Sequence, residues 1–344
     1  MTPLDTVAVI GGGGWGTALA IHLSRLGMTP RLWVYEAELA GLIRSRRENS
    51  WYLPGIALSP SVTPTSELAE ALNGADLVIL AVPSHVFREV LSGASRWISP
   101  RTTLLSATKG LDGAGPHRMS EIMAQLVSES PAAVLSGPTF AREVAEGRPT
   151  AAVVAARDPD VSRRLQQRLS SREFRLYTNG DVIGVELGGA VKNVMAIGTG
   201  LADGLALGEN TRAALITRGL AEITRLGVAL GAAPPTFAGL AGLGDLVLTC
   251  TGALSRNRSL GLALAAGKRL EEVQAGSRMI AEGVSTAASV LTLARRAGVS
   301  MPICQEVAAV LFEGKPAREA LNALLQREVG EEEPLPDRVQ SGGR

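Results

Sequence analysis

TVAVIGGGGWGTALA, residues 6–20, is the stretch that decides the fold class. Its first part, 6–10, is a short apolar run rich in β-branched residues that ends at glycine, as buried parallel strands do. TALAIHLSRL, at 17–26, has the composition of a helix, and Gly27 supplies a helix stop signal. The stretch therefore predicts a strand, a glycine-rich turn and a helix in immediate succession.

The glycine-rich turn fits the spacing G-x-G-x-x-G in only one register, which places the pattern on Gly11, Gly13 and Gly16. Such glycines allow a tight turn, a close approach of the backbone to a pyrophosphate and close packing of strand against helix. The N-terminus of the following helix offers free N–H groups to the phosphates. A merely flexible glycine loop would have no need to lie between a strand and a helix. We therefore predict that this turn binds a dinucleotide, NAD or NADP.

Strand-like apolar runs alternate with helix-length segments through the first half of the chain, which predicts βαβ units and a parallel sheet. From about Val182 these runs vanish, and Ala-, Leu- and Gly-rich helical stretches follow. We predict an α/β fold, with a Rossmann-type, doubly wound, mostly parallel sheet in 1–181 and an all-helical substrate-binding domain in 182–328. The acidic tail, 329–344, is predicted to be disordered. After 6–10, the strand-like runs are 31–35, 76–82, 102–107, 132–136 and 150–156.

The composition narrows the class of protein. Of 344 residues, 46% are hydrophobic and 19% charged, and the net charge of +1 gives no electrostatic footprint for nucleic acid. The first residues lack the features of a signal peptide, and we expect no run approaching the roughly 18 apolar residues of a membrane helix. Cys250 and Cys304 form no metal-type pair with the three histidines. The expectation is a cytoplasmic, reduced protein with neither a metal site nor a membrane segment.

The end of the second strand carries Tyr35 and then Glu36. An acidic residue at this point favours NAD, because it accepts a hydrogen bond from the ribose, whereas a basic residue accommodates the extra phosphate of NADP. The alternative for Glu36 is a solvated acid at the start of the next helix. Arg44, Arg46 and Arg47 follow on that helix and could still meet a phosphate.

Two lysines stand in unusual surroundings. Only four of the 34 basic residues are lysine, and Lys268 and Lys315 have the sequence context of solvated helix ends. Lys109 in SATKGL and Lys192 in GAVKNV lie in apolar or glycine-containing stretches instead. Because lysine can lose its proton where arginine cannot, both are candidates for proton transfer. The alternative for Lys192 is a lysine at a helix edge that extends its ammonium group to solvent.

Further polar residues lie in short motifs that an ordinary surface would not require. SATKGL and SGPTFA (136–141) follow strand runs, at the edge where ligands bind in open α/β sheets. AGLGDLVLT (241–249) holds polar side chains in apolar company, and SRNR (255–258) has a phosphate-binding composition near a predicted helix start. Each motif alone has a plainer explanation, such as a helix cap, a helix-facing hydroxyl or a surface charge.

Together, the motifs resemble those of bacterial NAD(P)-dependent glycerol-3-phosphate dehydrogenases. The resemblance runs from about residue 6 to 325 and rests on GxGxWGTALA, YLP (52–54), VPSHVF, SATKGL, SGPTFA, GGAVKNVMAIGTG, AGLGDLVLTC and SRNR, in this order. It implies a reversible reduction of dihydroxyacetone phosphate to sn-glycerol 3-phosphate with NAD or NADP, which supplies glycerophospholipid synthesis. The resemblance implies small-molecule ligands, with no nucleic acid, and we consider a homodimer as the assembly.

The resemblance assigns roles residue by residue. Lys192 falls at the general acid/base, with Lys109 as a second cation and Asp245 to hold and balance it. A lysine whose pKa is lowered by burial and by a nearby cation can give a proton to a ketone oxygen and take it back. Substrate contacts fall on Lys109, Gly137, Thr139, Lys192, Asn193, Asp245, Thr249, Ser255, Arg256 and Asn257. Cofactor contacts fall on Gly11, Gly13, Gly14, Trp15, Gly16, Tyr35, Glu36, Tyr52, Lys109, Ala141, Arg256, Ile280 and Glu282.

Two positions depart from the family pattern. Gly14 stands where the family often has Ser, and Tyr35 stands where it often has Arg, which weakens the expectation of an NADP preference. One rival interpretation is a dehydrogenase of the same architecture that acts on a β-hydroxyacid or 6-phosphogluconate, but SRNR and SGPTFA fit it poorly. The other is a nicotinamide-binding sensor without chemistry, against which the retained Lys192, Asp245 and Arg256 argue.

Overall fold

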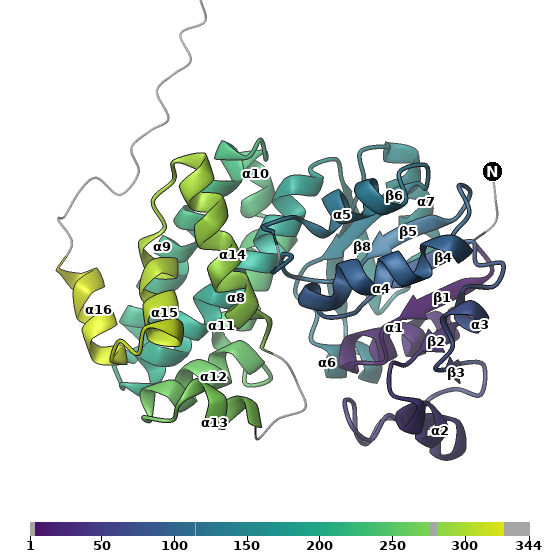
Figure 1. The fold of residues 1–344 in the computed structure, drawn as a ribbon, viewed down its shortest axis with the longest axis horizontal. Helices are drawn as coiled ribbons and strands as arrows, with labels where there is room; N and C mark the ends of the chain where they lie inside the picture. Colours follow the sequence, from purple (N-terminus) through teal and green to yellow (C-terminus); the bar gives the residue numbers. More distant parts are fainter. Residues whose placement is uncertain (1–3, 114, 276–280, 327–344) are drawn as a thin grey trace, which may run out of the picture.

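The computed structural model describes residues 4–113, 115–275 and 281–326, which form a sheet region and a helical region lying side by side (Figure 1). The predicted disordered tail, 329–344, lies outside the described residues.

The sheet has eight strands in the order β3-β2-β1-β4-β5-β6-β7-β8. All neighbouring strands are parallel except β6 and β7, so the predicted mostly parallel α/β fold is confirmed. Two strands had no apolar run to predict them, because β3 reads TPT and β8, at the sheet edge, alternates buried and exposed residues. The strands are β1 (Val7–Ile10), β2 (Arg31–Trp33), β3 (Thr63–Thr65), β4 (Leu77–Leu80), β5 (Thr103–Ser106), β6 (Ala132–Ser136), β7 (Thr150–Ala155) and β8 (Phe174–Asn179).

The strand order reverses between β1 and β4, and this switch point positions the first part of the site. From β1 the chain proceeds to β2 and β3 on one side, and from β4 it continues to β5 and β6 on the other. A crevice at the carboxyl ends of the strands is expected at such a point. The helices of this region are α1 (Gly14–Arg25), α2 (Ala37–Arg46), α3 (Leu68–Leu72), η1 (Ser84–Val86), α4 (Phe87–Ala94), η2 (Ser95–Trp97), α5 (Met119–Leu126), α6 (Ala141–Glu146) and α7 (Pro159–Leu169).

Glycine is required both at the start of the turn between β1 and α1 and within the first turn of α1. Gly11 has a φ of +125°, and a Cβ there would lie 2.6 Å from the carbonyl oxygen of Ala81. At Gly16 a Cβ would lie 1.9 Å from the carbonyl oxygen of Gly11. A Cβ at Gly13, by contrast, would meet no described atom within 4 Å. The turn is therefore packed tightly against the sheet on one side and open at Gly13.

The helical region is built around α8, which packs against α9, α11, α12 and α14 and also against β6. The helices of this region are α8 (Val182–Gly204), α9 (Gly208–Ala229), α10 (Pro234–Phe237), the π-helical turn η3 (Leu240–Gly244), α11 (Asp245–Thr251), α12 (Arg256–Ala265), α13 (Leu270–Ala275), α14 (Glu282–Ala297), α15 (Pro302–Phe312) and α16 (Ala317–Leu325).

Helix α8 corrects one expectation, because it is long and apolar enough to pass a test for a membrane span. Its most apolar 18-residue window has a mean hydropathy of 1.2, but 94% of that window is buried inside the protein. A helical region beginning near Val182 was predicted, but its apolar length was not, because glycines and single polar residues interrupt the apolar run. Its apolar character serves a core in which neighbouring helices approach closely: a Cβ at Gly200 would lie 2.2 Å from the carbonyl oxygen of Arg258 on α12.

Candidate active site

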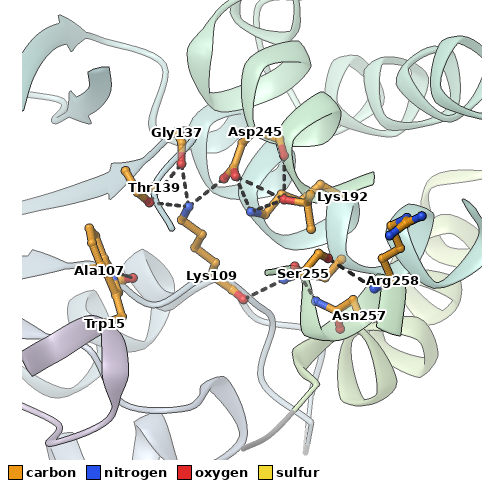
Figure 2. A network of polar contacts seen from close by, with 12 residues as sticks. Trp15, Ala107, Lys109, Gly137, Thr139, Lys192, Asp245, Ser255, Asn257 and Arg258 are labelled. Carbon is orange, nitrogen blue, oxygen red and sulfur yellow. Dashed lines mark hydrogen bonds and ion pairs between the residues drawn. The ribbon is translucent and has the colours of Figure 1, made fainter. Parts of the chain in front are cut away.

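Lys109 lies in the loop after β5, at the carboxyl edge of the sheet. Its Nζ donates hydrogen bonds to the carbonyl oxygen of Gly137 at 2.6 Å, to Oγ1 of Thr139 at 2.9 Å and to Oδ2 of Asp245 at 2.7 Å. A lysine ammonium has three donors, so protein partners occupy every donor of Lys109. Figure 2 shows these groups converging on Lys109 from the loop after β6 and from α11.

Lys192, in the middle of α8, meets the same carboxylate from the other side. Its Nζ donates to Oδ1 of Asp245 and to Oγ1 of Thr249, the latter at 2.9 Å. The Thr249 hydroxyl in turn donates to the carbonyl oxygen of Asp245 at 2.6 Å, which turns its lone pairs toward the lysine. Among the described residues these are the only two hydrogen-bond partners of the Lys192 ammonium, so one of its three donor positions has no protein partner.

The surroundings of Lys192 favour the loss of its proton. Lys192 is 6% exposed and Asp245 1% exposed. Burial lowers the pKa of Lys192 to about 7; the negative charge of Asp245 works against this shift, and the positive charge of Lys109 adds to it. A group with this pKa is present in both protonation states near neutral pH, as a general acid/base requires.

The local backbone explains how Asp245 reaches both lysines. The π-helical turn Leu240–Gly244 precedes α11, and such turns are frequent at functional sites. Glycines let this turn and α8 approach closely, since a Cβ at Gly188 would lie 2.4 Å from the carbonyl oxygen of Ala241. At Gly189, a Cβ would lie 2.3 Å from the Oγ of Ser136 at the end of β6. The paired glycines before Lys192 thus bring α8 against both the aspartate segment and the sheet.

Two asparagine amides form a chain of hydrogen bonds beside this cluster. Asn193 Nδ2 donates to the carbonyl oxygen of Lys109 at 3.3 Å, and Asn257 Nδ2 donates to Asn193 Oδ1 at 2.9 Å. Asn257 Oδ1 accepts from the backbone N–H of Gly283 at 2.9 Å. The chain links the loop after β5 to α8, α12 and the start of α14, so both predicted substrate contacts also hold the walls of the site together.

SRNR lies at the beginning of α12. Ser255 is the N-cap, and its side chain accepts the backbone N–H of Arg258 at 3.2 Å. Arg256 has an exposed side chain at the first position of the helix. Arg258, which the sequence did not single out, pairs with Asp203 instead, at 2.8 and 2.7 Å. Of the two arginines in the motif, Arg256 is therefore the one whose guanidinium has no hydrogen-bond or ion-pair partner among the described residues.

The predicted cofactor contacts form a second group around the glycine-rich turn. Trp15 Nε1 donates to the carbonyl oxygen of Ala107 at 3.1 Å, which joins α1 to the loop that carries Lys109 (Figure 2). The Tyr52 hydroxyl donates to Glu36 Oε1 at 2.7 Å. Ala141 begins α6, and its Cβ would be 3.8 Å from a Cβ at Gly14. Gly14, Trp15 and Ala141 therefore lie around the same end of α1.

The remaining cofactor predictions fall in three different places. Glu282 begins α14 and accepts a hydrogen bond from the Ser84 hydroxyl at the start of η1, which joins the helical region to the segment after β4. Burial raises the pKa of Glu282, whereas hydrogen bonds from Ser84 lower it. Tyr35 is 79% exposed, and its ring contacts Trp33 edge-on. Ile280 lies outside the described residues.

Two residues that sequence reasoning missed support these groups. Asn49 is fully buried and donates to the carbonyl oxygen of Gly12 at 2.7 Å and to Oγ1 of Thr17 at 2.8 Å, so it clamps the glycine-rich turn. Ser84 holds Glu282. Asn49 lies in no motif, and Ser84, although part of VPSHVF, was assigned no role, because each acts through a long-range contact that only the fold creates.

A dinucleotide-type sheet, an open glycine-rich turn and a buried lysine with a lowered pKa are the features expected of a two-domain, nicotinamide-dependent dehydrogenase. Residues 6–162 match the family described as NAD-dependent glycerol-3-phosphate dehydrogenase N-terminus, and residues 181–322 match the corresponding C-terminus. The chain belongs to this NAD-dependent glycerol-3-phosphate dehydrogenase family.

Individual relatives agree with this assignment. The chain is 51% identical over 328 residues to a glycerol-3-phosphate dehydrogenase of Geobacter sulfurreducens named for NAD(P)+, covering 94% of this chain and 98% of that one. It is 50% identical over 329 residues to the enzyme of the same name from Koribacter versatilis, covering 94% and 98%. The crystal structure of glycerol-3-phosphate dehydrogenase from Coxiella burnetii superposes with a TM-score of 0.92 at 41% identity, covering 94% of this chain and 100% of that one.

Proposed function

We propose that this protein catalyses the reversible reduction of dihydroxyacetone phosphate to sn-glycerol 3-phosphate with NADH or NADPH, and that Lys192 is its general acid/base. Membership of the family supports the reaction. The observation that carries the role of Lys192 is its ammonium group, buried with a pKa of about 7 and with one donor position that no described residue occupies. Lys109, whose three donors all have partners, is the electrostatic member of the pair.

The residues around the glycine-rich turn fit a nicotinamide dinucleotide. The backbone is open at Gly13, and α1, all of which the structure describes, has no acidic side chain in its first turn to repel a pyrophosphate. Gly11 to Gly16 would hold the pyrophosphate, and Glu36, to which the Tyr52 hydroxyl donates, would hold the adenosine ribose. Trp15, Lys109, Ala141 and Glu282 would contact the remainder. When bound, the reduced cofactor supplies a hydride to the carbonyl carbon of the substrate.

Proton transfer is the task of the lysine cluster. As the ketone is reduced, negative charge develops on its oxygen, and the Lys192 ammonium donates a proton to that oxygen. In the reverse direction the neutral amine removes the hydroxyl proton. Asp245 holds Nζ in place and stabilises its charged form, while Lys109 stabilises the neutral form and attracts the anionic substrate. The opposing charges keep the lysine pKa within reach of both directions.

The phosphate anchor is the start of α12. Arg256 offers a planar guanidinium that can form paired hydrogen bonds with a phosphate, and the helix N-terminus adds its dipole. Binding energy gained at the phosphate positions the carbonyl group, so it contributes to turnover as well as to affinity. Asn257 shapes this corner through its contacts with Asn193 and Gly283.

The proposal extends to the biological setting. We propose a cytoplasmic homodimer whose product supplies glycerophospholipid synthesis, and this part rests on the family resemblance.

Initial-rate assays test the proposed function. The wild-type protein should reduce dihydroxyacetone phosphate with NADH or NADPH and should leave unphosphorylated dihydroxyacetone essentially unreduced. Arg256→Ala should raise KM and lower kcat, because the lost anchor also positions the carbonyl. Arg269→Ala, which removes an exposed guanidinium beyond the same helix, is the matched control and should behave as wild type. Equal turnover of the two substrates by the wild type would overturn the phosphate anchor.

A further inference from the structure

Residues 49–54, here called the strap, follow α2 and contact both the glycine-rich turn and Glu36. At one end, Asn49 clamps Gly12 and Thr17, and its Oδ1 accepts the backbone N–H of Tyr52 at 3.1 Å. At the other end, Arg142 on α6 donates to the carbonyl oxygen of Pro54 at 2.6 Å. The strap is therefore held at both ends, which restricts where the tyrosine between them can lie.

Tyr52 uses this fixed backbone to reach Glu36. Its carbonyl oxygen lies so near Gly14 that a Cβ there would come within 2.9 Å of it, closer than side chains tolerate. Its hydroxyl donates to Glu36 Oε1 at 2.7 Å, the length of a charge-assisted hydrogen bond. Glu36 Oε2 has no hydrogen-bond partner among the described residues. One carboxylate oxygen is thus held and the other is left for a ligand.

We propose that Tyr52 is a positioning residue that fixes the carboxylate of Glu36, the N-cap of α2 just beyond β2, and so makes the site prefer NADH to NADPH. This inference rests on the proposed function, since it concerns the cofactor of the same reaction. A fixed carboxylate accepts hydrogen bonds from ribose hydroxyls. Toward a 2′-phosphate it presents a like charge that cannot rotate away, so the wrong cofactor is rejected by repulsion.

The neighbouring arginines do not reverse this preference. Arg44 donates to the carbonyl oxygen of Pro64 at 3.0 Å, and Arg47 donates to the carbonyl oxygens of Ser59 and Val62, the latter at 2.9 Å. Both guanidinium groups are therefore engaged with the backbone around β3. Arg46, exposed at the end of α2, is the remaining cation of the three, and the experiment includes it as the rival reader of the phosphate.

The test is equilibrium binding of NADH and of NADPH, followed by nucleotide fluorescence in the absence of substrate. Wild type should bind NADH more tightly. Tyr52→Phe keeps the ring and removes the hydroxyl, and it should reduce the ratio of the two dissociation constants by roughly three- to tenfold, as loss of one hydrogen bond predicts. Glu36→Gln should reduce the ratio further, and adding Tyr52→Phe to it should change nothing more. Tyr177→Phe, on β8, is the matched control.

Several results would overturn the proposal. An unchanged ratio in Tyr52→Phe would show that the hydroxyl does not position the acid. An equal fall of the ratio in the Glu36→Gln background would show that Tyr52 contacts the nucleotide itself. A wild type that prefers NADPH, and loses the preference in Arg46→Ala, would make Arg46 the discriminating residue. Failure of the proposed reaction is a separate result, because binding is measured without any ketone.

Discussion

Two buried ionic networks meet on helix α8, and they are built on opposite principles. In the first, Glu186 accepts hydrogen bonds from Arg118 at 2.9 Å and from the backbone N–H and hydroxyl of Ser120, the former at 2.8 Å. Arg118 also donates to Glu121 at 2.8 Å and closes a capping box at the start of α5. Burial raises the pKa of Glu186, and Arg118 opposes the shift. Its cation is an arginine, which keeps its charge.

The second network, Lys109–Asp245–Lys192, uses lysines and leaves one donor position of Lys192 without a partner among the described residues. Its two ammonium groups lie on either side of the Asp245 carboxylate. They repel each other electrostatically, while the carboxylate attracts both. The difference shows how the same element supports two tasks. The first network pairs its buried carboxylate with an arginine that keeps its charge, whereas the network proposed to transfer protons keeps a titratable donor open and its pKa low.

Replacing Lys192 should have the largest effect, and it tests whether the second network transfers protons. Lys192→Arg and Lys192→Met should each lower kcat by at least about 10²–10⁴-fold, the contribution of a positioned acid/base, although Arg keeps the charge. The reason is that guanidinium cannot give up its proton near neutral pH. Steady-state assays with dihydroxyacetone phosphate measure the loss, and circular dichroism should show an unchanged fold.

Lys268→Arg, an exposed lysine after α12, is the control for Lys192→Arg and should retain full activity. Near-wild-type turnover in Lys192→Arg would make Lys192 an electrostatic clamp and would leave Lys109 or water as the proton donor.

Breaking the first network should instead destabilise the protein. Arg118→Met leaves the Glu186 carboxylate buried without its cation, and unfolding in urea should show a loss of about 3–5 kcal/mol. Turnover at 25 °C should change little in the fraction that remains folded. Arg163→Met, which removes an exposed pair with Asp160, is the control and should cost less than about 1 kcal/mol. A large loss of kcat without a loss of stability would mean that the first network also serves the chemistry.

The sheet and the glycine-rich turn could be predicted because their signals are local. Each signal is complete within a few residues: the β-branched run of β1, the glycine spacing and the composition of the following helix. The antiparallel placement of β7 carries no such signal, since strand direction depends on where the chain crosses the sheet. Strand β8 was missed for a related reason, as an edge strand buries only one face.

Candidate site residues could be proposed from motifs, but the arrangement of their donors could not be. SATKGL and GAVKNV look equally suited to proton transfer, and only the fold shows that Gly137, Thr139 and Asp245 occupy every donor of Lys109. Asn49 is the opposite case, because its amide matters only through contacts with a turn far back in the sequence.

The pH dependence of kcat/KM tests whether Lys192 of the second network titrates during turnover. The pKa of Lys192 is about 7, so kcat/KM for ketone reduction, which needs the protonated lysine, should fall as pH rises through this value. For oxidation of sn-glycerol 3-phosphate, which needs the neutral lysine, kcat/KM should rise through the same range. Each limb should approach about tenfold per pH unit beyond the pKa. Parallel limbs in the two directions would assign the titration to another group.

Replacing Lys109 by arginine should have a smaller effect than replacing Lys192, breaking the Arg118–Glu186 pair or changing the pH. It separates the role of the charge from the role of proton transfer within the second network. Lys109→Arg keeps a cation beside Asp245 and should lower kcat by roughly tenfold, equal to about 1.4 kcal/mol, through imperfect contacts with Gly137 and Thr139. The pH limbs should stay in place. Lys109→Met removes a charge that lowers the pKa of Lys192, so its limbs should move to higher pH. If Lys109→Arg were as damaging as Lys192→Arg, or if Lys109→Met left the limbs unmoved, the division of labour between the two lysines would be wrong.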